Sequence, residues 1–301
     1  MALFKTTPHL LEKIWGGEYL NKINSSRFPY PIGESLEVSI LNNQNCKVRF
    51  NSELVDLGDL LGSNLKYLIK FLDTSDNLSV QVHPDDQMAK NLENSNGKTE
   101  CWFIISADVN AGIYLGFKEG VTKSILEKAL HEKENINELM NFYKVSSGEF
   151  FYVPAGTVHA IGSGVVLCEV QQSSGITYRV WDWNRVDKDN KSRKLHIDKA
   201  LSVLNFEKKC NDLNFFRYQN KLLSCKNETL INHKDFSVEI FNIEQEQNYR
   251  ISEKEECSII FIDGIGNIDN NSYRSFESFV KTGDNVVNVQ PKSKTTFLKI
   301  Y

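Results

Sequence analysis

The chain has 301 residues, and 41% of them are hydrophobic, which is enough for one large β domain or two smaller ones. The formal net charge of −4 argues against a general nucleic-acid-binding protein, because such proteins normally carry a basic face. No apolar run reaches the roughly 18 residues of a transmembrane helix. Neither nucleic acid nor a membrane is therefore an expected partner.

The cysteines and the N-terminus indicate the compartment. Six cysteines are scattered along the chain without a C-x-x-C pair, and most have apolar neighbours, so reduced and partly buried thiols are expected. The first eight residues lack the apolar core of a signal peptide. We therefore expect a cytoplasmic protein. The sequence carries no indication of its oligomeric state.

The first predicted elements are strands. Three stretches alternate or are β-prone, namely 36–41, 67–72 and 78–83. In the last of these, Gln81 and His83 are two residues apart and therefore point to the same face of the strand. Pro84 lacks an amide hydrogen and ends the strand, and the Asp85-Asp86 pair can open a short helix.

A helical insertion interrupts the next run of strands. Strands are predicted at 100–105 and 111–116, and again at 149–153, 165–170 and 177–183. Between them, near 120–145, apolar residues recur at helical intervals: Ile125, Leu126, Ala129 and Leu130, then Ile136, Leu139, Met140 and Tyr143. A further helical patch follows at 196–204.

The chain is expected to divide into two domains. Residues 1–205 form the first, a mainly β domain of the cupin jelly-roll type that contains the helical insertion. Residues 211–301 form a second, smaller and degenerate β-barrel, with short strands such as 236–241 and 258–262 and a single histidine, His233. No spacing typical of a metal site occurs in this second part.

One pattern suggests a buried ligand histidine. Gly148-x5-Pro154-x-Gly156-x2-His159 matches the second cupin motif, in which the glycines allow a tight turn that directs the histidine inward. The alternative is a turn followed by an ordinary buried histidine. The presence of further ligand-type residues upstream favours the metal ligand.

Those further residues are Gln81, His83 and Glu100. Imidazole and carboxylate ligands together suit zinc, iron or manganese, and tetrahedral zinc suits the mixture well. Gln81 is either a direct ligand or a group that orients a ligand. Glu100 opens an apolar strand, where an unpaired carboxylate is costly to bury, and either a metal or Lys98 could compensate it. The four other histidines (His9, His131, His196 and His233) lack partners at ligand spacing, and we interpret them as structural or surface residues.

Several motifs in a fixed order resemble one known family. They run from Trp15-Gly-Gly and Ile32-Gly-Glu-Ser through Gln81-Val-His-Pro, Lys98-Thr-Glu and Tyr152-Val-Pro-Ala-Gly-Thr-Val-His to Gln171-Gln-Ser-Ser, Tyr178-Arg and Leu195-His-Ile. This order resembles the class I mannose-6-phosphate isomerases (phosphomannose isomerases) of the cupin superfamily, in their short bacterial form. The resemblance covers about the first 205 residues well and the remainder weakly.

The resemblance implies a function and a set of site residues. It implies that mannose 6-phosphate and fructose 6-phosphate are interconverted through an enediol, and that one zinc ion is bound per chain. The implied metal ligands are His83, Glu100 and His159, with Gln81 as a further one. The implied catalytic residues are Arg179 and Glu169, and Lys98 and Arg185 are implied to bind the sugar phosphate.

From the residues themselves, some roles stay open. Glu169 could carry the proton if burial raises its pKa, or it could be a structural partner of Arg179 or Lys98. Arg179 stays protonated and therefore acts as an electrostatic clamp and not as a base. Two other functions compete with the isomerase: an iron-dependent cupin oxygenase, and a sugar-binding cupin without catalysis.

Overall fold

The computed structural model describes residues 2–23, 31–62, 65–186, 190–252, 256–284 and 286–301. The chain forms two compact units, each built from separate segments. Unit 1 consists of Met1–Leu11, Ser35–Phe71 and Gln219–Tyr301, and unit 2 consists of Glu12–Glu34 and Leu72–Tyr218. Residues 219–301 of the predicted second domain thus lie in unit 1 together with two segments that the sequence pattern placed in the first domain, while 211–218 lie in unit 2.

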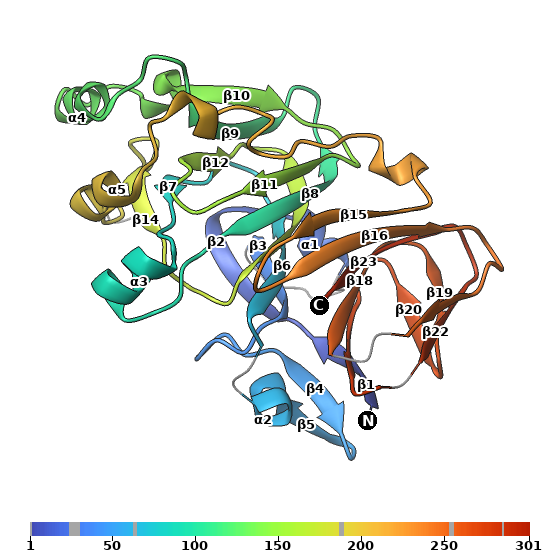
Figure 1. The fold of residues 1–301 in the computed structure, drawn as a ribbon. Helices are drawn as coiled ribbons and strands as arrows, with labels where there is room; N and C mark the ends of the chain where they lie inside the picture. Colours follow the sequence, from blue (N-terminus) through green and yellow to red (C-terminus); the bar gives the residue numbers. More distant parts are fainter. Residues whose placement is uncertain (1, 24–30, 63–64, 187–189, 253–255, 285) are drawn as a thin grey trace. The chain divides into compact units, whose positions relative to one another are not determined.

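Unit 2 contains a five-stranded antiparallel sheet in the order β10-β9-β12-β7-β14 (Figure 1). Its strands are β7 (Val80–Val82), β9 (Gly112–Phe117), β10 (Met140–Lys144), β12 (His159–Ile161) and β14 (Tyr178–Trp181). The strands β7, β9 and β14 lie where the sequence predicted strands, at 78–83, 111–116 and 177–183. In the part of the chain that the structure describes, β14 has one neighbouring strand, β7, so it forms an edge of the sheet.

A second antiparallel group in unit 2 places β8 between β11 and β13. These strands are β8 (Glu100–Ala107), β11 (Phe150–Val153) and β13 (Val165–Gln172). Trp102 lies opposite Glu169 in the β8–β13 register, and Glu100 lies opposite Gln171. One apolar cluster joins Ile113 of the five-stranded sheet to residues of β8, β11 and β13, so the two sheets face each other across a shared core.

Helices cover the other face of the five-stranded sheet. The described helices of unit 2 are α1 (Tyr19–Ile23), α3 (Asp86–Glu93), α4 (Lys123–His131), α5 (Ile197–Val203) and the short 3₁₀ helices η2 (Ile136–Leu139) and η3 (Lys208–Cys210). Leu126 of α4 and Ala200 of α5 belong to one apolar cluster with Val80 and Val82 of β7. Asp85 caps α3 as predicted, because its side chain accepts a hydrogen bond from the amide of Met88.

The helical insertion is confirmed, but it is shorter than the periodicity predicted. Helix α4 ends at His131, and Met140 and Tyr143 lie in strand β10 and not in a helix. Strand β10 pairs with β9, with Tyr143 opposite Ile113. A tertiary strand pairing has therefore outweighed the local helical spacing.

Unit 1 contains an eight-stranded sheet, β15-β16-β23-β18-β21-β1-β4-β5, and a four-stranded sheet, β17-β22-β19-β20. The strands are β1 (Ala2–Thr7), β4 (Lys47–Phe50), β5 (Glu53–Asp56), β15 (Asn227–Asn232), β16 (Ser237–Ile243), β17 (Tyr249–Ile251), β18 (Cys257–Asp263), β19 (Ile265–Ile268), β20 (Asn271–Arg274), β21 (Ser278–Thr282), β22 (Val287–Pro291) and β23 (Thr295–Ile300). Its described helices are α2 (Leu57–Leu61) and the 3₁₀ helix η4 (Leu222–Ser224). Aromatic side chains such as Phe241, Phe261 and Phe297 fill its core.

Three further strands contain three of the four points at which the chain passes between the units, and the fourth lies between Tyr218 and Gln219. These strands are β2 (His9–Gly17), β3 (Ile32–Val38) and β6 (Tyr67–Asp73).

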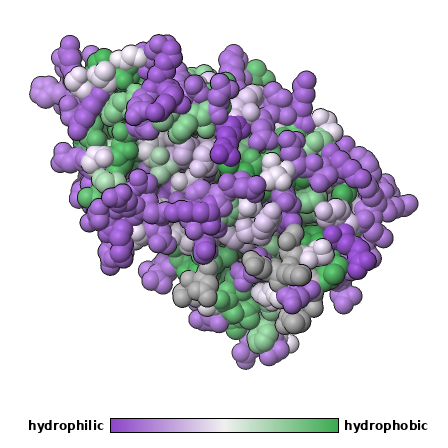
Figure 2. All heavy atoms as spheres, in the orientation of Figure 1, coloured by the Kyte–Doolittle hydropathy of each residue, from purple (hydrophilic) through white to green (hydrophobic). Residues whose placement is uncertain are grey.

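The mainly β class predicted from the sequence is confirmed by this inventory of strands. Within the described part of the chain, no helix has the length and apolar character needed to cross a membrane. On the face shown in Figure 2, hydrophilic residues predominate and hydrophobic ones form separate patches.

Candidate metal centre

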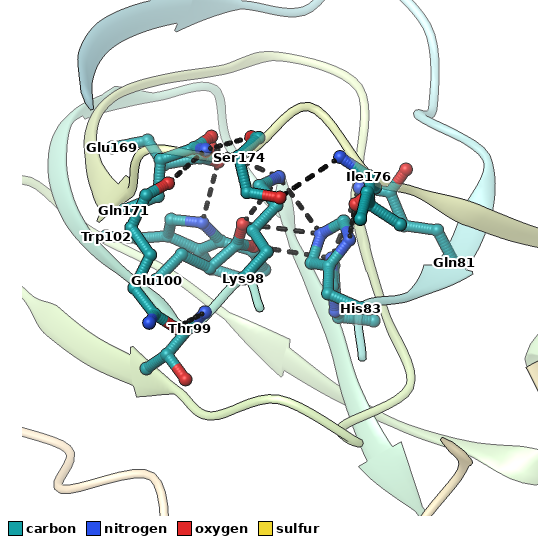
Figure 3. Close-up of polar contacts among 12 residues, drawn as sticks. Gln81, His83, Lys98, Thr99, Glu100, Trp102, Glu169, Gln171, Ser174 and Ile176 are labelled. Atoms are coloured by element: carbon teal, nitrogen blue, oxygen red, sulfur yellow. Dashed lines mark hydrogen bonds and ion pairs between the residues drawn. The ribbon is translucent and has the colours of Figure 1, made fainter. Parts of the chain in front are cut away.

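Three ligand-type side chains from separate segments of unit 2 meet in its interior. The nearest ligand atoms of His83, Glu100 and His159 all lie within 4.8 Å of one another, and all three residues are buried. The Nε2 atom of His83 is 3.4 Å from Oε2 of Glu100, and Nε2 of His159 is 3.3 Å from Oε1. Two imidazoles thus approach the two oxygens of one carboxylate (Figure 3, where His83 and Glu100 are labelled).

The backbone explains why these segments meet. His159 is the first residue of β12 and pairs with Gln81 of β7, while Glu100 is the first residue of the facing strand β8. The amide of Gly156 donates to the carbonyl of His83 at 2.8 Å, so the turn before His159 also fixes His83. Gly156 has φ of +84°, a left-handed conformation that favours glycine, as the motif predicted.

The outer nitrogens of both imidazoles are bound to backbone carbonyls. Nδ1 of His83 lies 2.9 Å from the carbonyl of Ile176, and Nδ1 of His159 lies 3.0 Å from that of Thr157. A carbonyl only accepts, so each Nδ1 must carry the proton. Burial, and then the charge of Lys98, lower the pKa of His83 to about 3. Both Nε2 atoms are consequently left with lone pairs that face Glu100.

Glu100 itself supports the assignment to a cation site. Burial alone would raise the pKa of Glu100, but Lys98 and the neighbouring imidazoles outweigh it and hold that pKa well below its ordinary value. Neither buried oxygen of Glu100 accepts a hydrogen bond of normal geometry within the described part of the chain. A carboxylate and the Nε2 atoms of two imidazoles thus converge, with Lys98 and the amide of Gln81 as neighbouring donors. This set of acceptors fits a divalent metal ion.

Lys98 supplies the positive charge that the buried carboxylates face. Its Nζ lies 2.9 Å from Glu100, 3.7 Å from Glu169 and 3.1 Å from Nε2 of His83. The ion pair between Glu100 and Lys98, which the sequence left open as an alternative to a metal, is therefore present. It accounts for one oxygen of Glu100 and leaves the Oε1 side directed at His159.

Gln81 reaches the centre through its amide nitrogen. Its Nε2 is 3.2 Å from Nε2 of His159, and its Oε1 is 3.5 Å from Oγ of Ser79. With Nδ1 of His159 protonated, Gln81 donates to the same lone pair that a metal would use. A direct ligand role would therefore require the amide to turn its oxygen toward the ion.

Sequence reasoning missed Trp102. Its indole Nε1 donates to Oε2 of Glu169 at 3.0 Å, and its ring meets that of His159 edge-on at 5.4 Å between centroids. The position of Trp102, two residues after Glu100 on the same strand, places both side chains on one face. That spacing was the signal that could have identified it.

Sequence reasoning also missed the loop that supports His83. The side-chain amide of Gln171 donates to the carbonyls of Gln172 and Ser174, and Oγ of Ser174 donates to the carbonyl of Asn96 (Figure 3). These bonds fix the segment that presents the carbonyl of Ile176 to His83. A second layer of polar contacts thereby orients the candidate ligand.

The two predicted arginines lie in different surroundings. Arg179 lies opposite Gln81 in the β14–β7 register, and its Nη1 donates to the carbonyl of Lys194 at 2.8 Å. Arg185 pairs with Asp182 at 2.6 Å and with Asp76 at 3.1 Å, and it lines a cavity of about 390 Å³. Arg185 is therefore not among the residues in contact with His83, Glu100 or His159 in the described part of the structure.

Comparisons with known proteins find relatives of this chain by sequence. Residues 35–101 match the family model described as phosphomannose isomerase type I, catalytic domain. The chain is 39% identical over 210 residues to the mannose-6-phosphate isomerase ManA of Bacillus subtilis, with 65% of this chain and 66% of the relative covered. It is 38% identical over 217 residues to the mannose-6-phosphate isomerase of Streptococcus mutans, with 66% and 67% covered. The aligned part spans just under two thirds of the first relative and about two thirds of the second.

Solved structures extend the likeness over the whole chain. The mannose 6-phosphate isomerase from Bacillus subtilis superposes with a TM-score of 0.84 and 25% identity, covering 100% of both chains. A phosphomannose isomerase mutant from Salmonella typhimurium gives a TM-score of 0.77 at 16% identity, a likeness of fold alone, over 100% of this chain and 99% of the other. The predicted cupin-type fold is confirmed by these superpositions.

Proposed function

This chain belongs to the phosphomannose isomerase type I family, and we propose that it interconverts mannose 6-phosphate and fructose 6-phosphate at the His83–Glu100–His159 centre. One observation carries the proposal. The Nε2 atoms of two imidazoles and the carboxylate of Glu100, all buried, converge from three segments to within 4.8 Å of one another. Such a set suits a divalent ion, and nitrogen and oxygen ligands together suit zinc.

We assign His83, Glu100 and His159 to the zinc ion, with Gln81 as a further ligand if its amide turns. When bound, the ion would supply positive charge beside the carbonyl and hydroxyl oxygens of the sugar, where negative charge develops in the reaction. Because His83, Glu100 and His159 are buried, charge at this centre would be screened less than at the surface.

Isomerisation moves a proton between C2 and C1 of the sugar through an enediol, so a base is required. We assign this proton transfer to the carboxylate of Glu169. Glu169 is buried, its Oε2 accepts from Trp102, and its Oε1 lies 3.7 Å from Nζ of Lys98. Both neighbours orient the carboxylate, and general base catalysis contributes about 10²–10⁴-fold in rate.

The phosphate and the sugar oxygens require cationic partners. We assign Arg179 as an electrostatic clamp and Lys98 and Arg185 as groups that bind the sugar phosphate. Burial, and then the nearby Arg193, lower the pKa of Arg179 from its ordinary value, but a guanidinium remains charged at working pH. The Nε atoms of Arg179 and Arg185 are buried without a hydrogen-bond partner in the described residues, so each retains a donor for a ligand.

A coupled assay tests the proposal. Formation of fructose 6-phosphate from mannose 6-phosphate should proceed with the purified protein, stop after chelation and return on addition of zinc. Metal analysis should give one zinc per chain. Iron together with oxygen uptake would instead support a cupin oxygenase, and sugar binding without turnover would support a non-catalytic cupin.

A matched pair of variants tests the arginine. Arg179→Ala should remain folded and keep its metal yet lose most turnover, because the clamp acts on developing charge. Arg250→Ala, at an exposed position of unit 1, is the control and should retain activity. Unchanged turnover in Arg179→Ala would rule out the role of Arg179 as an electrostatic clamp.

A further inference from the structure

The segment 194–196 holds Arg179 at three points. Nη1 of Arg179 donates to the carbonyl of Lys194 at 2.8 Å, and the amide of Arg179 donates to Nδ1 of His196 at 3.1 Å. In return, the amide of His196 donates to the carbonyl of Arg179 at 2.8 Å. Two of these three bonds thus involve the main chain of Arg179 and a single residue, His196.

The topology explains why Arg179 needs this partner. Among the described strands, β14 is an edge strand whose only neighbour is β7, and its register shifts between Arg179 and Trp181. The amide and carbonyl of one residue lie on the same side of a strand. Because both of these groups of Arg179 bind His196, they point away from β7. His196 therefore takes the place of a missing neighbouring strand at this position.

The same arrangement determines where the side chain of Arg179 lies. A residue whose main-chain groups point away from the opposite strand forms a non-hydrogen-bonded pair, in which the facing side chains are closest. The residue facing Arg179 is Gln81, which itself contacts Nε2 of His159. His196 is therefore linked to the candidate metal centre by its hydrogen bonds to Arg179, by the strand pairing of Arg179 with Gln81, and by the contact of Gln81 with His159.

We propose that His196 is a positioning residue that fixes Arg179 beside Gln81 at the candidate active site. The inference rests on the proposed function, since it gives Arg179 its role. Nδ1 can accept from Arg179 only while the imidazole is neutral and Nε2 carries the proton. Burial, together with the charges of Arg179 and Lys194, lowers the pKa of His196 and favours that neutral form.

Two amide substitutions separate this role from a general structural one. The side-chain oxygen of asparagine can occupy the place of Nδ1, whereas that of glutamine lies near the place of Nε2. We therefore expect His196→Asn to retain kcat within about threefold of the native enzyme. His196→Gln and His196→Ala should lower kcat by about 10- to 100-fold, with a smaller change in KM, because displacing a charge-stabilising group acts mainly on the transition state.

Controls ensure that the protein itself is intact. All variants should keep one metal ion per chain and a circular dichroism spectrum like that of the native protein. His131→Ala, at the exposed end of α4, is the matched histidine control and should keep native activity. If His196→Ala does not fold, the comparison between His196→Asn and His196→Gln still decides the matter. Equal kcat in these two variants would overturn the inference.

Amide hydrogen exchange provides a test that does not depend on activity. Exchange at Arg179 should be about tenfold faster or more in His196→Gln and His196→Ala than in the native protein, and protected in His196→Asn. The expected exchange rates could be found while the native protein does not isomerise mannose 6-phosphate. That result would contradict the proposed function but still support the role of His196 in positioning Arg179. Identical exchange in all variants would overturn the positioning itself.

Discussion

Trp102 donates a hydrogen bond from its indole Nε1 to Oε2 of Glu169, and the two residues lie directly opposite each other on strands β8 and β13. The same indole meets the ring of His159 edge-on. One buried side chain therefore orients both the carboxylate assigned as the base and a candidate metal ligand. This arrangement makes Trp102 a sensitive point for testing the mechanism.

Replacing Trp102 with phenylalanine should remove the donor while keeping an aromatic ring in the core. We expect stability to fall by about 1–3 kcal/mol, because one buried carboxylate oxygen loses its hydrogen bond. Turnover should fall more than substrate affinity, since the orientation of Glu169 is lost. Steady-state kinetics and thermal unfolding would measure both effects. The control is Trp181→Phe, which removes an indole that instead donates to Asn184, and a kcat as low in this control would contradict the specific role of Trp102.

Replacing Glu100 with glutamine should abolish metal binding. The change preserves the shape of the side chain but removes the negative charge between the two imidazoles. We expect affinity for zinc to fall by more than about 100-fold, as loss of a direct ligand should exceed the effect of losing a group that only orients one. Metal analysis after dialysis against a chelator would measure the loss. Glu127→Gln, at an exposed position of α4, should bind metal like the native protein. Full metal occupancy in Glu100→Gln would rule out a metal site formed by His83, Glu100 and His159.

Gln81 distinguishes a ligand from an orienting group. As placed, its amide nitrogen contacts His159, so Gln81→Ala should weaken metal binding by about 10- to 100-fold if the residue only orients the ligand. Direct coordination predicts a loss comparable to that of Glu100→Gln. Parallel zinc titrations of the two variants would decide between these roles. If Gln81→Ala bound zinc with native affinity, Gln81 would neither coordinate the metal nor orient a ligand.

Glu37 of unit 1 should make stability depend on pH. Burial raises the pKa of Glu37 to about 7, although Ser35 and Ser278 both donate to its carboxyl group. The folded protein therefore keeps this proton to about pH 7, while the unfolded chain releases it near 4.5. Between these values the folded state binds more protons, so stability should fall as the pH rises.

The expected size of this effect follows from the same numbers. At about 1.4 kcal/mol per pKa unit, the rise from 4.5 to about 7 corresponds to a loss of about 3 kcal/mol above pH 7. Glu37→Gln should remove this loss, and unfolding midpoints between pH 5 and pH 8.5 would measure the difference, with exposed Glu228→Gln as the control. If the unfolding midpoints of Glu37→Gln and of the native protein changed equally with pH, the prediction would be contradicted.

Much of the candidate site was predictable from local sequence because strand and turn chemistry are local. Alternation placed Gln81 and His83 on one face, and the Pro154–Gly156 pattern predicted the tight turn before His159, in which the structure gives Gly156 a left-handed conformation. Apolar, β-prone runs likewise marked β8, β11 and β13. The helical spacing failed at Met140 and Tyr143, because pairing of β10 with β9 is a long-range interaction that the periodicity of the segment does not encode.

The amino-acid sequence by itself determined the types of the ligand residues, the segments that carry them and the mainly β class, since these depend on side-chain chemistry and on periods of two and 3.6 residues. Only the tertiary structure decided which residues face one another. It set Trp102 opposite Glu169, placed Lys98 between two carboxylates and bound His196 to Arg179. It also brought 1–11 and 35–71 into one unit with 219–301. Register and pairing between distant strands arise from packing of the whole core, and no local stretch of the chain specifies them.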